Sequence, residues 1–314
     1  MKKKITLIII LLIFSLISVN ATESSNVNYP NRTIELVVPG TVGQDSDISA
    51  RLYAEELSKL WKVPVIVNVI SNTPSAIRLV HEAKPDGYMA LMMNDAFFTN
   101  VAQRTIDFGI EDMTLLGIVE QSDGQVLVSR SELGWKNLDD LKEACDKEPD
   151  TYTVAVAFGA TTVVMGKMLV NEGIQCRLVD SSGGADRIAS MLGKHIDAAF
   201  LVWSSAKEYV ENGQWNVLCI LNPERSKVAP EIPTAIEQGY NAEFPTRHFI
   251  ALTGGVNDDI IRTWNEALSS ISNNPDFQEL MFEKLFATAC FIGKEESLRI
   301  FNSRQPLLNE ILGE

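Results

Sequence analysis

The three histidines are the residues of this sequence best suited to catalysis, but their surroundings form no recognisable catalytic pattern. His81, His195 and His248 stand in no chain order with a serine and a carboxylate that matches a Ser–His–Asp triad. The sequence also lacks a Gly-x-Ser-x-Gly elbow, a phosphate-binding P-loop, an HExxH zinc motif and a Gly-x-Gly-x-x-Gly dinucleotide loop. We therefore expect solvated or core histidines, no bound cofactor and no enzymatic activity.

The four cysteines are the other candidates for metal or redox chemistry. Cys145, Cys176, Cys219 and Cys290 form no CxxC pair and have no histidine at ligand spacing, so no metal site is expected. Cys176 and Cys219 lie in apolar, strand-like runs, which favours buried free thiols. Disulfide formation is the alternative if the protein is exported.

Small, polar loops that follow strands and precede helices are the stronger candidates for ligand binding. Ligands of open α/β sheets bind outside the carboxyl ends of the strands, where helix N-termini present unpaired N–H groups and a partial positive charge. A single such loop is often only a turn. Several in both halves of the chain indicate a cleft between two lobes. The loops are residues 40–47, 71–75, 94–95, 158–162 and 180–184.

The elements that would position these loops alternate between strand and helix. Residues 34–38 and 63–69 are rich in Val and Ile, and a helix with an apolar stripe begins between them, near Ser46 or Asp47. With a turn at 71–75, a helix at 76–82 and a strand at 88–93, the order is β-α-β-α-β. This order is typical of a doubly wound sheet with helices on both faces.

A second α/β half is expected further along the chain. We expect one lobe from residues 29–122 and 246–314 and the other from 123–245, with the chain crossing between them more than once. Strands are predicted at 113–119, 125–128, 152–157, 176–179, 197–202, 217–221 and 249–252. Helices are predicted at 138–145, 162–171, 186–192, 259–270, 276–286 and 294–312.

Composition and charge narrow the class of protein. Of the 314 residues, 46% are hydrophobic and 22% are charged, which is a globular composition and excludes a disordered tail or a fibre. The formal net charge is −14, from 27 basic and 41 acidic residues, so nucleic acid is not an expected partner. We expect a monomer.

Residues 1–21 have the features of a cleavable signal peptide. Lys2, Lys3 and Lys4 precede an uncharged run at 5–19, and Ala21 ends a segment of short residues suited to a signal peptidase. The run is shorter than the roughly 20 residues that a bilayer span needs. We expect export to the periplasm, with an uncleaved anchor as the alternative.

Four blocks of the chain, taken in order, resemble the receptors of tripartite tricarboxylate transporters, the TctC or Bug family. The family opening is Y-P, then a strand, a Gly-rich loop, Thr-Asp and a helix with an Arg; Asp47 and Arg51 fall on the last Asp and Arg. The resemblance covers the chain from about Tyr29 to its end. The blocks are Tyr29-Pro30 with residues 34–51, the P-D-G-Y turn at 85–88, the G-G to G-x-x-D segment at 183–197, and the E-R-S to G-Y segment at 224–240.

The resemblance implies a two-lobed α/β fold of the Venus-flytrap type, each lobe a doubly wound sheet flanked by helices. One small solute, usually a carboxylate, would be held between the lobes by backbone N–H groups and ordered water. The loaded receptor would deliver this solute to membrane transporter subunits. Docking to a sensor kinase is the first alternative, and a periplasmic enzyme on the same fold is the second.

The position of each loop in the resemblance implies which residues bind the ligand. Phe97 and Trp203 would supply apolar walls, with an ordinary core position as the alternative for Phe97. The lobe 1 residues are Gly43, Gln44, Asp45, Ser46, Asp47, Ser71, Asn72, Thr73, Asn94 and Phe97. The lobe 2 residues are Phe158, Gly159, Ala160, Thr161, Thr162, Asp180, Ser181, Ser182, Gly183, Gly184 and Trp203.

Acidic residues in these loops depart from the family pattern. Family loops are nearly free of acids, whereas Asp45 and Asp180 stand in loops that would hold the ligand here. An ionised carboxylate facing the cleft would disfavour a di- or tricarboxylate and favour a solute with an amine or amide. The alternative is that both side chains cap local backbone N–H groups.

Overall fold

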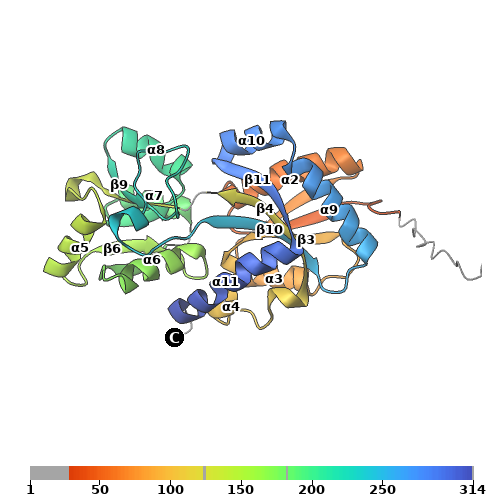
Figure 1. The fold of residues 1–314 in the computed structure, drawn as a ribbon, viewed down its shortest axis with the longest axis horizontal. Coiled ribbons are helices and arrows are strands. Elements are labelled where there is room, and N and C mark those ends of the chain that lie inside the picture. Colours follow the sequence, from red (N-terminus) through yellow and green to blue (C-terminus); the bar gives the residue numbers. More distant parts are fainter. Residues whose placement is uncertain (1–27, 123–124, 182, 313–314) are drawn as a thin grey trace, which may run out of the picture.

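The computed structural model describes residues 28–122, 125–181 and 183–312 and arranges them in two lobes, each a β-sheet between helices (Figure 1). The fold class expected from the sequence is confirmed. The predicted signal peptide lies outside the described residues. Within the described ranges, no helix combines the length and the apolar character needed to cross a membrane.

Lobe 1 is built on a six-stranded mixed sheet in the order β11-β4-β10-β3-β1-β2. The first three strands of the chain pair in parallel, whereas β10 runs antiparallel to both β3 and β4, and β11 antiparallel to β4. The strands are β1 (Ile34–Pro39), β2 (Val65–Ile70), β3 (Met89–Asn94), β4 (Met113–Ser122), β10 (Thr246–Thr253) and β11 (Ala287–Gly293).

Alternation along the strands decides which helices cover each face of this sheet. Ile34, Leu36 and Val38 point to one face, because side chains alternate along a strand, and pack with α2, α9 and α10. Val37 and Leu91 point to the other face and pack with α3, α4 and α11. The helices are α2 (Asp45–Trp61), α3 (Thr73–His81), α4 (Ala96–Ala102), α9 (Asp258–Ser272), α10 (Pro275–Leu285) and α11 (Lys294–Leu312).

Lobe 2 contains a five-stranded mixed sheet in the order β7-β6-β8-β5-β9. Helices α5 and α6 cover one face, and α7 and α8 the other. The strands are β5 (Val126–Arg130), β6 (Thr153–Val156), β7 (Arg177–Asp180), β8 (Ala198–Leu201) and β9 (Trp215–Ile220). The helices are α5 (Leu138–Lys147), α6 (Thr161–Asn171), α7 (Gly184–Leu192) and α8 (Trp203–Glu211).

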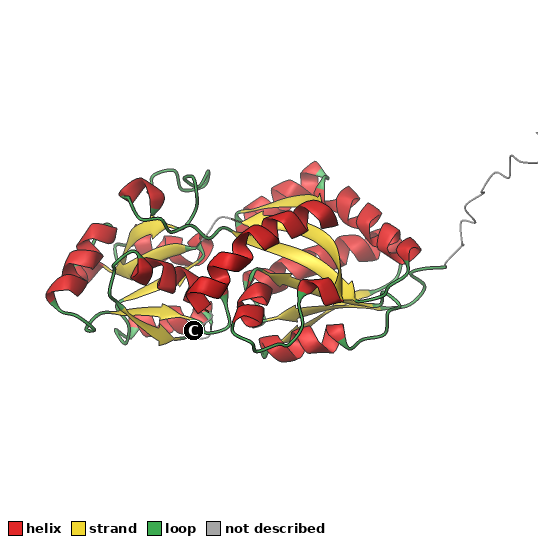
Figure 2. Ribbon diagram, turned by 60° about the horizontal axis from the view of Figure 1, so that its bottom comes forward, coloured by secondary structure: helices red, strands yellow, loops and turns green. Residues whose placement is uncertain are grey.

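The two lobes share one apolar core through helix α11. Both views show α11 extending from lobe 1 to lobe 2 (Figures 1 and 2), and it packs on α4 of the first and α6 of the second. Lys167 Nζ on α6 donates a hydrogen bond to the Ile311 carbonyl at 2.9 Å. This helix therefore ties the lobes together on one side.

Some elements differ from those expected. Helices α4 and α8 and strand β11 were not predicted, and the expected turn at 71–75 already contains the start of α3. Helix α10 ends before Phe286, which takes the left-handed conformation (φ 52°) as its C-cap. All four cysteines are free, as expected; Cys145, Cys176 and Cys219 are buried, whereas Cys290 is partly exposed.

Candidate functional site

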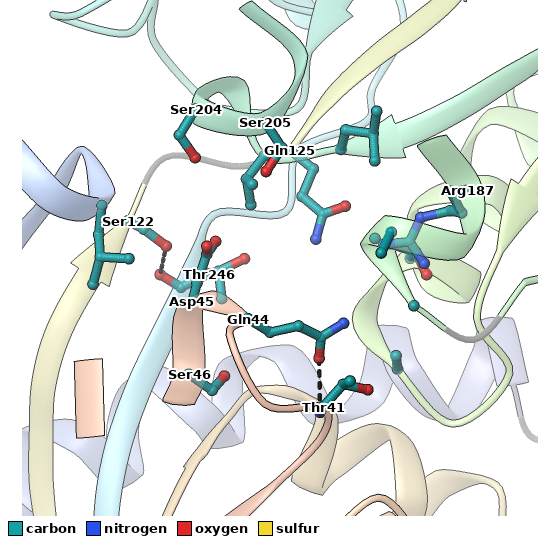
Figure 3. Close-up of a pocket in the computed structure, with 18 of the residues that line it drawn as sticks. Thr41, Gln44, Asp45, Ser46, Ser122, Gln125, Arg187, Ser204, Ser205 and Thr246 are labelled. Atoms are coloured by element: carbon teal, nitrogen blue, oxygen red, sulfur yellow. Dashed lines mark hydrogen bonds between the residues drawn. The ribbon is translucent and has the colours of Figure 1, made fainter. Parts of the chain in front are cut away.

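A cleft of about 400 Å³ opens between the lobes and is lined by residues of both (Figure 3). Lobe 1 contributes the loop between β1 and α2 and the carboxyl end of β3. Lobe 2 contributes the starts of α6, α7 and α8. Of the residues predicted to bind the ligand, those that line the cleft are Gly43, Gln44, Asp45, Ser46, Asn94, Ala160, Thr161, Thr162, Gly183, Gly184 and Trp203.

The other predicted residues are not brought to the cleft wall. Asn72 caps α3 instead, because its side chain accepts the Ser75 N–H at 2.9 Å. Phe97 is fully buried in the core beside Phe98 and Phe249. These residues are Asp47, Ser71, Asn72, Thr73, Phe97, Phe158, Gly159, Asp180 and Ser181, and Ser182 lies outside the described residues.

The two aspartates singled out in the sequence have different surroundings. Asp180 is exposed and accepts the Phe158 N–H at 3.1 Å, which is the local capping role. Asp45 lines the cleft. The charge argument therefore applies to Asp45 and not to Asp180.

The sequence did not identify several residues of the cleft. Arg187 lies one turn into α7. The Gly183-Gly184 pair at the start of that helix was predicted to bind the ligand, and it could have pointed to Arg187 one turn later. Thr246 and His248 come from β10, which returns to lobe 1 from the far end of the chain, so no local pattern marks them. Thr41 and Val42 belong to the predicted loop 40–47 but were not named as ligand-binding residues. The lining residues outside the predicted loops are Ser122, Gln125, Ala157, Ala185, Asp186, Arg187, Ile188, Leu201, Val202, Ser204, Ser205, Val228, Thr246, His248, Leu285 and Phe286.

Helices α2, α6, α7 and α8 begin at the cleft. Their N-cap residues are Gln44, Ala160, Gly183 and Val202, and no described residue at these four N-cap positions makes a side-chain capping hydrogen bond. The first N–H groups of a helix have no partner within the helix, and the macrodipole adds a partial positive charge there. These N-termini therefore suit an anionic group on a solute, most of all those of α6 and α8 in lobe 2, whose first turns carry no acidic side chain. The first turn of α2 contains Asp45 and Asp47, and that of α7 contains Asp186.

The loop before α2 directs an amide group across the cleft. Gly43 takes the left-handed conformation (φ 85°), which glycine adopts without a Cβ clash. Gln44 Oε1 accepts the Thr41 N–H at 3.1 Å, so its Nε2 turns toward lobe 2 (Figure 3). A Cβ at Gly183 would lie 3.6 Å from this Nε2, so the lobes come close here.

Arg187 places a buried cation in the lobe 2 wall. Its Nε donates to the Phe200 carbonyl at 2.9 Å and one terminal nitrogen donates to the Ser181 carbonyl at 3.0 Å. Burial lowers the pKa of Arg187 to about 10, so the guanidinium stays charged at neutral pH. A cation one turn into a helix opposes the helix dipole, and an anionic solute would relieve this opposition.

Asp45 gives the opposite wall a negative charge. Burial, and to a smaller extent the nearby Glu120, raise the pKa of Asp45 to about 6, whereas His248 acts to lower it. Asp45 is therefore mostly ionised at pH 7 but protonates in mild acid. The lobe 1 wall of the cleft therefore carries a titratable acid, and the lobe 2 wall carries the fixed cation Arg187 with Asp186 beside it.

Ser46, His248 and Glu120 contact one another in the order serine, histidine, acid. Their positions in the sequence are far apart, so this arrangement was not predicted. Ser46 Oγ lies 2.9 Å from His248 Nε2, and His248 Nδ1 lies 3.3 Å from Glu120 Oε1. Burial acts to lower the pKa of His248. The negative charges of Glu120, Asp45 and Asp95 together outweigh burial, so the pKa of His248 is raised above its usual value. A raised pKa favours the imidazolium, which cannot take a proton from a serine. We interpret the series as a binding feature that fixes the Ser46 hydroxyl.

Metal binding has no support in the described part of the chain. There, no group of three or more His, Cys, Asp or Glu side chains could hold a metal ion. The cleft is lined by backbone N–H groups, hydroxyls and amides, and by the charged or titratable side chains of Asp45, Asp186, Arg187 and His248.

Comparison with known proteins places this architecture in a family. Residues 49–291 match the family model described as tripartite tricarboxylate transporter family receptor. A UPF0065 protein of Bordetella pertussis is 26% identical over 264 residues, which cover 81% of this chain and 80% of that protein. Protein BugT of the same species is 27% identical over 256 residues, covering 77% and 78%.

Solved structures share the fold at low sequence identity. The periplasmic binding protein BugD superposes with a TM-score of 0.78 at 23% identity, covering 90% of this chain and 97% of its own. MatC from Rhodopseudomonas palustris with bound malate gives 0.79 at 20%, covering 90% and 100%. Another R. palustris protein, with adipate, gives 0.82 at 18%, covering 91% and 98%.

Proposed function

The chain belongs to the family of tripartite tricarboxylate transporter receptors, and on this premise we propose that it captures a small carboxylate-bearing solute in the periplasm. The family is one of solute-binding receptors rather than enzymes. The captured solute would then be delivered to the membrane subunits of a tripartite tricarboxylate-type transporter. Export would depend on the signal peptide predicted at residues 1–21.

The observation that carries this proposal is the convergence of uncapped helix N-termini on one cleft. Helices α2, α6, α7 and α8 all begin there, and Arg187 adds a buried cation on the lobe 2 side. An anion at such a site gains hydrogen bonds and dipole stabilisation together. The malate and adipate of two structural neighbours are carboxylates, which supports the same class of solute.

Binding between two lobes provides the signal that a transporter can recognise. A solute that contacts both walls stabilises the closed arrangement over the open one by its difference in affinity for the two. The membrane subunits would then recognise the closed form. Helix α11 would act as the fixed side of this hinge, because it packs on both lobes.

A thermal-shift screen of the chain without residues 1–21 tests the proposal. Carboxylates, amino acids and amines are compared, followed by calorimetry of any solute that raises the unfolding midpoint. A solute at 100 times its Kd stabilises the native state by about 2.7 kcal/mol. We expect carboxylate-bearing solutes to raise the midpoint and uncharged analogues to leave it unchanged. Binding of amines alone would contradict the proposal.

Transport is tested separately by uptake of the identified solute. Cells that carry the membrane subunits are compared with and without this receptor, and uptake at low solute concentration should depend on the receptor. A receptor that binds the solute but does not support its uptake would contradict delivery to the transporter.

A further inference from the structure

Asp45 differs from the other aspartates around the base of the cleft in what its carboxylate contacts. Asp47 accepts the Gly43 N–H at 2.8 Å, Asp95 accepts the Arg247 N–H at 2.8 Å, and Asp180 accepts the Phe158 N–H at 3.1 Å. Each of these has a backbone donor as a partner. No donor among the described residues makes a hydrogen bond to the Asp45 carboxylate.

The surroundings of Asp45 are two hydroxyl-bearing residues and one cation that is shared with Glu120. Figure 3 shows Asp45 beside Ser122 and Thr246 on the lobe 1 side, with Arg187 on the opposite side. Ser122 Oγ donates to the Thr246 carbonyl at 3.4 Å, so its hydroxyl already has an acceptor other than Asp45. The charged groups that face Asp45 are Glu120 on β4 and His248 on β10, and these two already form an ion pair.

The opposite end of the cleft has the reverse chemistry. Helices α6 and α7 begin there without side-chain caps at Ala160 and Gly183, and Arg187 is the fixed cation. Asp186, in the first turn of α7, also lines this end and interacts with Arg187. A solute that spans the cleft therefore meets N–H donors and a guanidinium at one end. At the other end it meets a carboxylate that needs a donor.

We propose that Asp45 determines specificity by selecting a carboxylate solute that presents a hydrogen-bond donor, such as an ammonium or an amide N–H, to the lobe 1 end of the cleft. The solute's carboxylate would lie at the N-termini of α6 and α7. This inference rests on the proposed function, since it assumes that the cleft binds a carboxylate. It narrows the class from carboxylates in general to those with a donor at the far end.

The preference for a donor-bearing solute over a dicarboxylate has an upper limit that depends on pH. A dicarboxylate could bind by forcing a proton onto Asp45, and with a pKa of about 6 this protonation costs about tenfold in affinity at pH 7 and about 100-fold at pH 8. Below pH 6 the carboxyl is itself protonated and the discrimination disappears. Preference for the donor-bearing solute should therefore be measured above pH 7.

Calorimetric titration of matched probes tests the inference. For chains of four to six carbons, the dicarboxylate, its monoamide and the ω-amino acid are titrated at pH 8 and pH 5. The proteins are the unmodified chain, Asp45→Asn and the control Asp180→Asn, whose carboxylate caps a loop outside the cleft. We expect the amide or amino acid to bind the unmodified chain and Asp180→Asn at least tenfold more tightly than the dicarboxylate at pH 8.

Each result supports the inference or contradicts it. Loss of the preference in Asp45→Asn at pH 8, and in the unmodified chain at pH 5, supports it. Equal or tighter binding of the dicarboxylate by the unmodified chain at pH 8 overturns the inference and leaves the proposed function intact. Absence of binding by every carboxylate at both pH values overturns the proposed function and this inference with it.

Discussion

Two groups of helices differ in how their N-termini are capped: α2, α6, α7 and α8, which begin at the cleft, and α3, α5, α9 and α10, which begin away from it. At the cleft, Gln44, Ala160, Gly183 and Val202 make no side-chain cap within the described chain. Away from the cleft, α3, α5, α9 and α10 each have an asparagine N-cap. These are Asn72, Asn137, Asn257 and Asn274, which accept an N–H of their own helix at 2.9, 2.8, 2.8 and 2.9 Å.

The difference separates N-termini that serve stability from those available to a ligand. A capping side chain contributes about 1 kcal/mol to stability by satisfying an N–H group that the helix leaves unpaired. Four helices of this protein forgo that contribution where a solute would bind. The following predictions test this contrast.

The largest expected effect is that of Arg187→Ala. The substitution leaves the carbonyls of Phe200 and Ser181 without their donor and should lower the free energy of unfolding by about 2–3 kcal/mol. It should also weaken binding of a carboxylate, because the cation of the lobe 2 wall is lost. Urea denaturation and calorimetry measure the two effects. The control Arg177→Ala removes an exposed arginine of the same lobe and should change neither.

The next effect concerns the pH dependence of stability without ligand. The pKa of Asp45 is about 6 in the folded protein and near 3.8 ordinarily, so stability is lost as the pH rises toward 6. Asp45→Asn should therefore raise the free energy of unfolding by about 1–2 kcal/mol above pH 6, allowing for partial exposure. The gain should fade between about pH 6 and 4. The exposed Asp107→Asn is the control, and an equal gain there would contradict the assignment.

A crossed pair of cap substitutions should give opposite results. Ala160 has the extended conformation of a capping residue (φ −118°, ψ 173°), so Ala160→Asn should add about 0.5–1 kcal/mol of stability. It should also weaken solute binding, because the new side chain takes an N–H group from the cleft. Asn72→Ala should lower stability by about 1 kcal/mol and leave binding unchanged. Unchanged binding by Ala160→Asn would break the contrast.

The smallest effect is spectroscopic. Of the five tryptophans, Trp203 lines the cleft, at the first position of α8. Solute binding should change the tryptophan fluorescence, and Trp203→Phe should remove most of that change. A solute-induced change that survives the substitution would place the solute elsewhere.

The contrast also explains what the sequence predicted and what it did not. The loops at 40–47, 158–162 and 180–184 lead into helices at the cleft, because each follows a parallel strand and the carboxyl ends of these strands in both sheets face the cleft. The loop at 71–75 has the same composition, but its Asn72 caps α3. The residue type at the N-cap distinguishes the two cases. It can be read from the sequence once the start of the helix is known, but the overall composition of the turn does not reveal it.

The rest of the site depends on contacts between distant parts of the chain. Ser46 and His248 are 202 positions apart and meet only because β10 inserts between β3 and β4. Phe97 was predicted in the cleft wall, yet its side chain is buried in the core. It lies on the short helix α4, and the sequence did not show whether Phe97 faces the cleft or the core. Pairing of antiparallel strands from opposite ends of the chain has no local signature.

The central claim, that a carboxylate is held by uncapped helix N-termini, is tested most directly by nuclear magnetic resonance of the backbone amides. A solute found in the thermal-shift screen is titrated into the labelled chain without residues 1–21. The amide signals of the first turns of α2, α6, α7 and α8 should shift at saturation, and those of α3, α5, α9 and α10 should stay in place. Shifts confined to the asparagine-capped helices, or absent from the first turns at the cleft, would contradict the account.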